Sequence, residues 1–191
     1  MKPALLFLLL PLALVSFGFS TTAPQQAPPA HVWRQSIKTD AARGTAYDQY
    51  TLTGKFLKAP QRGDFSNRPA LVVDCNPPKE SRNGKGKFEG MSLLVGTSVK
   101  IHYVEPEEIH GTSYYPKVFV QYRRNDGKDE KEQWAPGSDK TSISIPKDAL
   151  KKFLRAQTID ITVIDESGSP IVMKFDMADP TLVEQGCNVD E

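Results

Sequence analysis

The side chains that most often carry chemistry in proteins are few in this 191-residue chain. Histidine occurs at His31, His102 and His110, and cysteine only at Cys75 and Cys187. A zinc site would have to combine His102 and His110 with a glutamate of the acidic stretch before His110, since imidazole and carboxylate groups bind zinc. This spacing matches no zinc motif, and acidic stretches are common on solvated surfaces. We therefore expect neither a metal site nor a cofactor.

Signatures of known catalytic mechanisms are also missing from the sequence. No GxSxG or CxxC motif occurs, and neither cysteine has a histidine near it in the chain. Residues 83–87 contain glycines and lysines, but not at the spacing of a phosphate-binding loop. Glycoside hydrolysis needs two opposed carboxylates, and the 23 acidic residues leave that mechanism open without singling out a pair. We expect a protein that is not an enzyme, with no identifiable catalytic residue.

The N-terminus has the organisation of a secretory signal peptide. Lys2 precedes an uncharged apolar run at 4–19, and small residues follow it. The run is shorter than the roughly 20 residues that span a bilayer. We expect cleavage after residues 1–20, a disordered lead-in at 21–32, and a mature protein that is secreted or periplasmic. After cleavage no stable membrane insertion is expected.

Cys75 and Cys187 are expected to form one disulfide. An exported chain with an even number of cysteines favours pairing. Cys75 ends an apolar run at 71–75, and Cys187 lies near the C-terminus. The bond would close a loop of more than 110 residues, which the chain-entropy model values at about 4–5 kcal/mol. It would tie the C-terminal tail to a core strand.

The charge balance narrows the class of partner. Removal of Lys2 with the signal peptide leaves 23 basic residues against 23 acidic ones. A nucleic-acid-binding protein usually has a basic excess, and a protein held at a membrane surface has a polybasic cluster. We therefore expect a protein or cell-envelope partner and no nucleic acid.

One polar segment, 77–89, concentrates basic side chains next to an aromatic ring. We interpret it as a candidate contact loop for an anionic polysaccharide or an acidic protein surface; the alternative is a plain turn between strands. Its candidate contact residues are Lys79, Arg82, Lys85, Lys87 and Phe88.

Short alternating runs separated by Gly, Pro, Asn and Asp predict an antiparallel β-fold. Residues 33–191 contain no repeat and no sign of a second domain. We predict an antiparallel β-sandwich of about eight strands with one packed α-helix and a short C-terminal helical turn. The strand candidates outside the hairpin discussed next are 50–56, 70–75, 91–95, 99–104, 141–145, 158–164 and 171–177.

The clearest local signal is a hairpin at 125–127, because Asp-Gly is a preferred type I′ turn pair. With Asp126 and Gly127 in the turn, the predicted cross-strand pairs are Arg124 with Asp129, Arg123 with Glu130, and Phe119 with Trp134. Two opposite-charge pairs and one aromatic pair would support this register.

A helix is predicted to begin after Pro146, which suits a first helical turn. Ala149, Leu150, Phe153 and Leu154 share one face, and Lys147, Lys151, Lys152 and Arg155 share the other. The basic face is either solvated or bound to an anionic partner. A helical turn at 179–185 is expected to bring Gly186 and Cys187 back to the sheet.

The order of these features resembles the VasI-type accessory proteins associated with bacterial type VI secretion. The similar residues are Trp33-Arg34, the strand at 50–56, the segment Arg-Pro-Ala-Leu-Val-Val-Asp-Cys at 68–75, the hairpin at 123–127 that ends in Trp134, Phe153-Leu154, Phe175-Asp176 and Cys187. The resemblance implies an exported, periplasmic, β-rich accessory domain, and it supplies no catalytic residues.

The function expected from the sequence is an exported, non-enzymatic binding or accessory domain of the bacterial cell envelope. Two alternatives remain open. One is an envelope-glycan hydrolase with carboxylates still to be identified, and the other is a structural subunit of a secretion complex.

Overall fold

The computed structural model describes residues 32–41, 44–60, 68–76, 85–96, 99–104, 115–138, 141–177 and 179–189. The predicted signal peptide (1–20) and all of the lead-in except Val32 lie outside these ranges. Within them the chain forms eleven strands and two short helices, which confirms the predicted mainly-β class. No helix in these ranges combines the length and the apolar character that crossing a membrane requires.

The elements follow one another along the chain in a simple order. They are β1 (Arg34–Thr39), β2 (Ala46–Thr53), β3 (Lys55–Lys58), β4 (Ala70–Cys75), β5 (Gly86–Leu94), β6 (Val118–Arg124), β7 (Asp129–Pro136), β8 (Ser142–Ile145), α1 (Lys147–Leu154), β9 (Thr158–Ile164), β10 (Pro170–Asp176), α2 (Thr181–Gly186) and β11 (Cys187–Asn188). Every strand pairing is antiparallel except that of β11 with β5.

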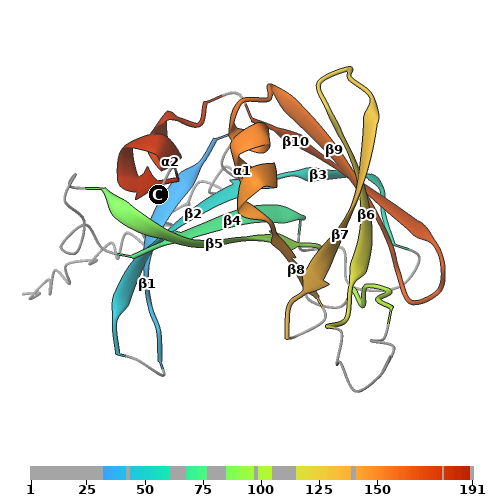
Figure 1. The fold of residues 1–191 in the computed structure, drawn as a ribbon, viewed down its shortest axis with the longest axis horizontal. Coiled ribbons are helices and arrows are strands. Elements are labelled where there is room, and N and C mark those ends of the chain that lie inside the picture. The colour runs from blue at the N-terminus through green and yellow to red at the C-terminus, as the bar shows by residue number, and fades with distance from the viewer. Residues whose placement is uncertain are drawn as a thin grey trace, which may run out of the picture.

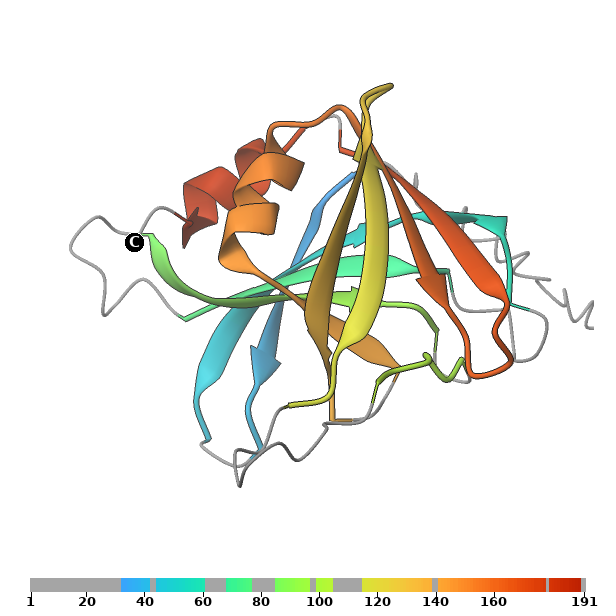
Figure 2. The ribbon, with the colours of Figure 1, turned by 45° about the vertical axis from the view of Figure 1, so that its right-hand side comes forward.

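The strands form two layers that cross each other steeply (Figure 1). The strand order is β1-β2-β4-β5-β8-β7-β6-β9-β10-β3, with β11 beside β5. The first five strands make one layer and the last five the other, and the layers meet where β8 pairs with β7. Both helices lie at one end of this sandwich-like arrangement (Figures 1 and 2).

Gly54 allows the chain to pass from one layer to the other. It separates β2, which pairs with β4, from β3, which pairs with β10, so the single strand predicted at 50–56 is two strands. A Cβ atom at Gly54 would lie 2.6 Å from the ring of Phe175 and 2.8 Å from the Lys174 carbonyl oxygen. Only glycine leaves room for so close a crossing.

The core lies between the two layers. The inward side chains of β9 and β10 alternate regularly and are fully buried; they are Ile159, Ile161, Val163, Ile171, Met173 and Phe175. Phe153 of α1 packs edge-on against Tyr122, at 5.2 Å between ring centroids, and Trp134 lies 5.7 Å from Tyr122. Such ring pairs contribute about 0.5–1.5 kcal/mol each beyond burial, so they hold the helix on β6 and β7.

The predicted register of the β6–β7 hairpin is wrong by one residue. Trp134 pairs with Val118, not with Phe119, and Arg123 pairs with Asp129, not with Glu130. In the observed register Val118 is buried, whereas the side chain of Phe119 is 55% exposed. A one-residue shift would turn the inward face of the strand outward, so burial of the apolar face determined the register.

The same shift changes the partners of the two arginines. Arg124, which was predicted opposite Asp129, forms a salt bridge with Glu130 at 2.7 Å. The Arg123 guanidinium bonds Asp160 of β9 at 2.9 Å. Gly127 N donates to the Arg124 carbonyl, and Asn125 adopts a positive φ of 53°, so the turn begins one residue earlier than the Asp-Gly rule placed it.

Two further predictions about strands need correction. The strand predicted at 99–104 is not formed, because this segment meets the β9–β10 turn and not a strand edge; it makes only the isolated bridges of Ile101 with Asp165 and Val104 with Lys117. The predicted connection at 76–87 ends earlier than expected, since Gly86 and Lys87 already belong to β5, where β11 pairs with them. Strand β1 was not predicted.

Both helical predictions are confirmed. α1 begins immediately after Pro146 and buries Ala149, Leu150, Phe153 and Leu154. α2 leads directly into β11, which places Cys187 beside the sheet. Cys187 is bonded to Cys75 of β4 with their Cα atoms 5.8 Å apart, as predicted. A stable disulfide fits an oxidising compartment.

Replacing both Cys75 and Cys187 with alanine is expected to lower the free energy of unfolding by about 4–5 kcal/mol. The bond joins residues separated by 112 positions, and in the chain-entropy model a loop of that size restricts the unfolded chain strongly. Urea denaturation of the oxidised protein and the double variant measures the loss. A loss below about 1 kcal/mol would contradict the expectation, and a reducing agent should leave the variant unchanged.

Candidate functional site

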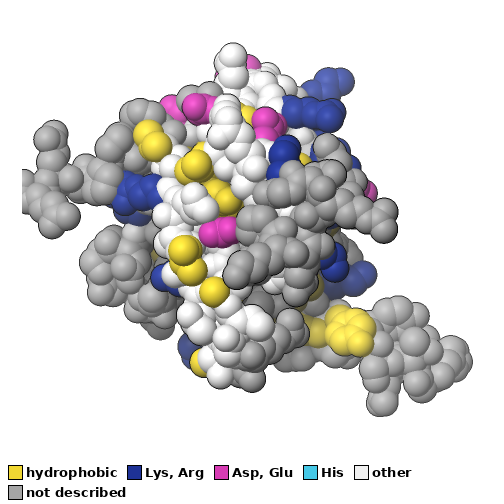
Figure 3. Space-filling model, turned by 90° about the vertical axis from the view of Figure 1, so that its left-hand side faces the viewer, with side chains coloured by type: hydrophobic (Ala, Val, Ile, Leu, Met, Phe, Trp, Pro, Cys, Tyr) yellow, Lys and Arg dark blue, Asp and Glu magenta, His cyan; other side chains and the backbone are white. Residues whose placement is uncertain are grey.

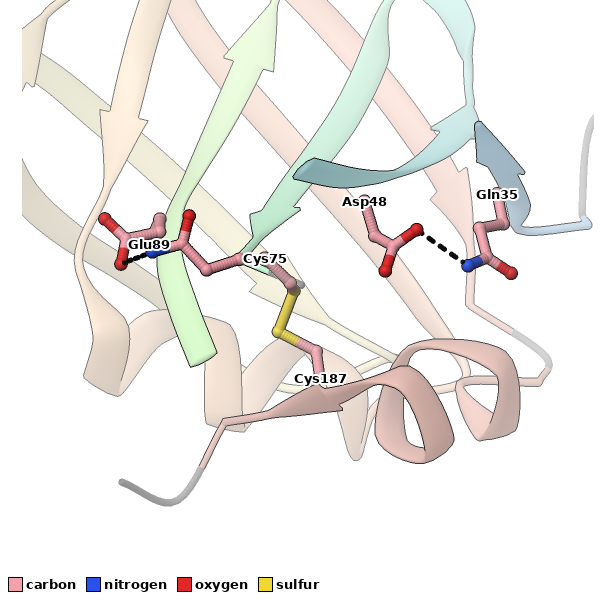
Figure 4. Close-up of a disulfide and its surroundings, with 6 residues drawn as sticks. Gln35, Asp48, Cys75, Glu89 and Cys187 are labelled. Atoms are coloured by element: carbon pink, nitrogen blue, oxygen red, sulfur yellow. Dashed lines mark hydrogen bonds between the residues drawn. A yellow bond between two sulfur atoms is a disulfide. The ribbon is translucent and has the colours of Figure 1, made fainter. Parts of the chain in front are cut away.

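The disulfide gathers three segments at one corner of the first layer. Cys75 ends β4, Cys187 begins β11, and β11 pairs with the first residues of β5, where Cys187 lies opposite Gly86. In Figure 4 the Glu89 carboxylate lies on one side of the bond and the Gln35–Asp48 pair on the other. The three chain segments pass so closely that a side chain at Gly86 would meet the Asn76 carbonyl oxygen.

A cavity of about 370 Å³ opens beside this corner. We call it the corner pocket. It lies between the turn of the β1–β2 hairpin and the adjoining ends of β4 and β5, and its lining combines three carboxylates with an amide, two threonine hydroxyls and a tyrosine. The lining residues are Thr39, Asp40, Ala41, Thr45, Tyr47, Asp74, Asn76 and Glu89.

Hydrogen bonds from side-chain amides orient two of the carboxylates. Gln49 Nε2 donates to Asp74 Oδ1 at 3.0 Å, and Asn76 Nδ2 donates to Glu89 Oε1 at 2.7 Å. The Lys87 ammonium lies 4.0 Å from the Glu89 carboxylate and is itself largely exposed. Both carboxylates therefore point in fixed directions, and among the described basic residues Lys87 reaches Glu89 from the rim.

The electrostatic environment of the corner pocket favours neutral or cationic partners. Burial raises the pKa of the Asp74 carboxyl, and the hydrogen bond from Gln49 opposes this shift only in part. Burial also raises the pKa of Tyr47, and the charges of Asp74 and Asp40 add to the increase. The Tyr47 hydroxyl thus stays protonated, and the half-buried Asp74 carboxylate is costly to keep charged without a positive partner.

The structure describes three of the five predicted contact residues, and they lie next to this corner. Lys85 and Lys87 are exposed, whereas Phe88 is half-buried against the core with the Lys147 ammonium 5.8 Å from its ring centroid. Lys79 and Arg82 lie outside the described residues. Along β5, Lys87 and Glu89 point to the side opposite Phe88, so Lys87 lies near Glu89 of the corner pocket while the ring of Phe88 packs against the core.

The sequence did not reveal the corner pocket itself. Its lining comes from three separate segments, around 39–47, 74–76 and 89, which only the fold brings together. The one available signal was Asp74, a charged residue inside the apolar run at 71–75. A carboxylate in such a run is costly to bury, which marks it as a functional candidate.

The histidines do not form a metal site with other ligands in the part of the chain that the structure describes. No cluster of three His, Cys, Asp or Glu side chains there has an arrangement that holds a metal ion. His102 is exposed, while His31 and His110 lie outside the described residues.

A second cluster of titratable groups lies under α1. Tyr122 Oη donates to Glu132 Oε1 at 2.6 Å, Trp134 Nε1 donates to Glu132 Oε2 at 2.8 Å, and Lys152 Nζ bonds Glu130 Oε2 at 3.2 Å. Burial tends to raise the pKa of Glu132, but the hydrogen bonds from Tyr122 and Trp134 outweigh it and lower the pKa. These groups satisfy one another, so the cluster fastens the helix to the sheet.

A second depression among the described residues, of about 170 Å³, lies on the outer face of the second layer. Arg123 and Asp160 line it and neutralise each other through their salt bridge. The surface that carries the β1–β2 hairpin is mixed as well, with small separate groups of hydrophobic side chains among polar and charged ones (Figure 3). Of these two cavities in the described part of the chain, the corner pocket is therefore the better candidate for binding a ligand.

Comparison with known proteins gives no relative from which a function could be transferred. No protein-family model matches the chain, no characterised protein matches it, and no solved structure matches it.

Replacing Asp74 with asparagine is expected to stabilise the protein at pH 7. Because burial raises the pKa of this carboxyl in the folded state, folding binds protons, and wild-type stability falls as the pH rises from the ordinary pKa of an aspartate through the raised pKa of the folded state. The Asp74→Asn variant lacks this loss while keeping an oxygen acceptor for Gln49. After solvent screening, the gain is expected to be a few tenths to about 1 kcal/mol at pH 7 and to vanish near pH 3.

Chemical denaturation between pH 3 and pH 8 measures this difference. Asp48→Asn is the matched control, because the Asp48 carboxylate also accepts a glutamine amide, from Gln35 at 3.0 Å, but lies outside the corner pocket. A wild-type stability that rises with pH relative to Asp74→Asn would show that the shift has the opposite sign.

Proposed function

We propose that this chain is an exported, non-enzymatic binding domain of the bacterial cell envelope, and that the corner pocket binds a basic side chain of a partner protein. The single observation that carries the proposal is the lining of this pocket. Asp40, Asp74 and Glu89 line a cavity of about 370 Å³, and Asp74 precedes the disulfide-bonded Cys75 in β4.

The chemistry of the lining favours a lysine or arginine side chain. Carboxylates bind ammonium and guanidinium groups through charge-assisted hydrogen bonds, and the tyrosine face attracts a cation. The stem of such a side chain needs a cavity to enter, and the corner pocket, of about 370 Å³, has Tyr47 and Asn76 among its lining residues. A positive charge that enters the pocket would also offset the free-energy cost of keeping the half-buried Asp74 carboxylate charged.

Two features agree with a location in the cell envelope. The signal-like N-terminus predicts passage across a membrane, and the Cys75–Cys187 bond requires oxidising conditions to persist. The resemblance to VasI-type accessory proteins agrees with a role beside other envelope proteins, either as a binding domain or as a structural subunit of a secretion complex.

One observation also favours the glycan-hydrolase alternative. Asp74 has a raised pKa and shares the corner pocket with Glu89, and glycosidases pair a protonated carboxyl with a charged carboxylate. Unlike the binding proposal, the hydrolase hypothesis requires that a glycan binds in the corner pocket and is cleaved there.

An NMR titration of the ¹⁵N-labelled protein distinguishes these functions. The probes are the blocked tripeptides Gly-Lys-Gly and Gly-Arg-Gly, the neutral control Gly-Gln-Gly, and an N-acetylglucosamine oligomer. Because an isolated ion pair near the surface is weak, the basic peptides are expected to bind with a dissociation constant on the order of 1 mM. Their chemical-shift changes should centre on Tyr47, Asp74 and Glu89.

The variants decide whether the corner pocket is responsible. Asp74→Asn together with Glu89→Gln should abolish the shifts, while Asp48→Asn should keep them. Equal shifts with the neutral peptide, or none with either basic peptide, would refute the proposal. Shifts and product release with the oligomer alone would establish the hydrolase alternative in its place.

A further inference from the structure

Strand β1 presents an open edge. It lies at one end of the sheet, and in the described part of the chain β2 is the only strand that pairs with it. All six of its residues are exposed, and the side chain of Ile37 is 74% exposed. The β1–β2 hairpin also reaches beyond the neighbouring strands (Figures 1 and 2). Such an edge is a template for the addition of another strand.

The hydrogen bonds of the hairpin show which backbone groups face outward. Asp40 N donates to the Thr45 carbonyl at 2.9 Å, so the backbone of Asp40 faces β2. Because these directions alternate along an antiparallel pair, the even-numbered residues of β1 face β2 as well. The outward backbone groups therefore belong to Gln35, Ile37 and Thr39.

The far side of β2 gives the same alternation independently. Gly54 N donates to the Pro69 carbonyl at 2.7 Å, which directs the even-numbered residues of β2 toward β4 and the odd-numbered ones toward β1. In the β1–β2 register, odd-numbered residues of β2 pair with even-numbered residues of β1, as Ser36 does with Gln49. Each of these two hydrogen bonds alone therefore places the outward-facing backbone groups at residues 35, 37 and 39.

A second copy of the same strand fits this edge in one register. Antiparallel pairing about a two-fold axis must join outward-facing residues to one another. With Ile37 opposite Ile37 of the second copy, Arg34 lies opposite Asp40 of that copy, and the symmetry repeats the pair. The two apolar side chains meet at the axis, with an opposite-charge pair on either side.

Neighbouring registers with the same alternation bring like charges together. Centring the pair on Ser36 places Arg34 opposite Lys38 of the second copy, and centring it on Lys38 places the two lysines opposite each other. Like charges directly opposite one another destabilise a strand pair. The charges on this edge thus oppose general strand addition while permitting the register centred on Ile37.

We propose that two copies of this chain associate through antiparallel pairing of their β1 strands, with Ile37 at the two-fold axis and reciprocal Arg34–Asp40 ion pairs. The sheet would then continue from one copy into the other. This inference goes beyond the proposed function and does not depend on it. Asp40 also lines the corner pocket, so the second copy's Arg34 would reach the rim of the pocket and leave Asp74 and Glu89 for the partner.

Sedimentation equilibrium of charge-reversal variants tests this pairing. An interface limited to one strand edge is small, so the wild-type protein is expected to dimerise with a dissociation constant of roughly 100 µM. Arg34→Asp and Asp40→Arg each place like charges opposite one another in the dimer and should weaken it at least tenfold. In an equimolar mixture of the two variants both charge pairs become attractive again, so dimers should reappear.

A proline variant keeps the proposal testable should a charge reversal disturb the fold. Ile37→Pro removes an outward N–H and no bond to β2, so it should abolish dimers, while circular dichroism confirms that the variant remains folded. A wild-type protein that stays monomeric up to about 1 mM would overturn the proposal. Dimerisation of Ile37→Pro, or a mixture of the two charge variants that stays monomeric, would overturn it as well.

Discussion

The bond between Cys75 and Cys187 is the constraint on which one whole corner of the molecule depends. β11 has only two residues and α2 only six, and backbone pairing over so short a length is marginal by itself. The disulfide replaces the missing pairing with a covalent link to β4. Through that link the C-terminal segment lies against the first residues of β5, and the end of β4 is fixed at Asp74 and Asn76, which line the corner pocket.

Elsewhere in the protein, side-chain packing holds the elements in place. The aromatic cluster of Tyr122, Trp134 and Phe153 fastens α1 to β6 and β7. The polar atoms of Tyr122 and Trp134 both donate hydrogen bonds to Glu132. The carboxylates of the corner pocket lie in a different environment. Asp74 interrupts an apolar strand and carries a raised pKa, so the fold tolerates a carboxylate there that does not stabilise it. Groups of this kind cluster at functional sites.

The sequence predicted those parts of the structure in which local pattern and burial agree. The strands at 158–164 and 171–177 alternate regularly, and α1 has one apolar face, so all three elements formed as expected, with β10 at Pro170–Asp176. At the β6–β7 hairpin the two signals disagreed. The Asp-Gly turn rule favoured one register, the inward face of Val118 and Tyr122 favoured the next, and burial prevailed. The segment 99–104 has the composition of a strand, but no strand edge lies beside it.

The binding site was harder to predict, because it exists only in three dimensions. Of the predicted contact segment, 77–89, the structure describes only residues 85–89, and the ring of Phe88 packs against the core. The carboxylates of the corner pocket are distant from one another along the chain, and no composition rule joins Asp40 to Glu89. The disulfide that organises the corner, by contrast, followed from a count of two cysteines.

Amide hydrogen exchange of the oxidised protein and of the Cys75→Ala, Cys187→Ala variant tests most directly whether the bond organises this corner. If it does, the amides of Lys87, Phe88 and Asn188 lose almost all of their protection in the variant, while those of β9 and β10 remain the most protected in the molecule. If the amides at the corner kept the same protection relative to β9 and β10 after removal of the bond, the disulfide would not be what organises this corner.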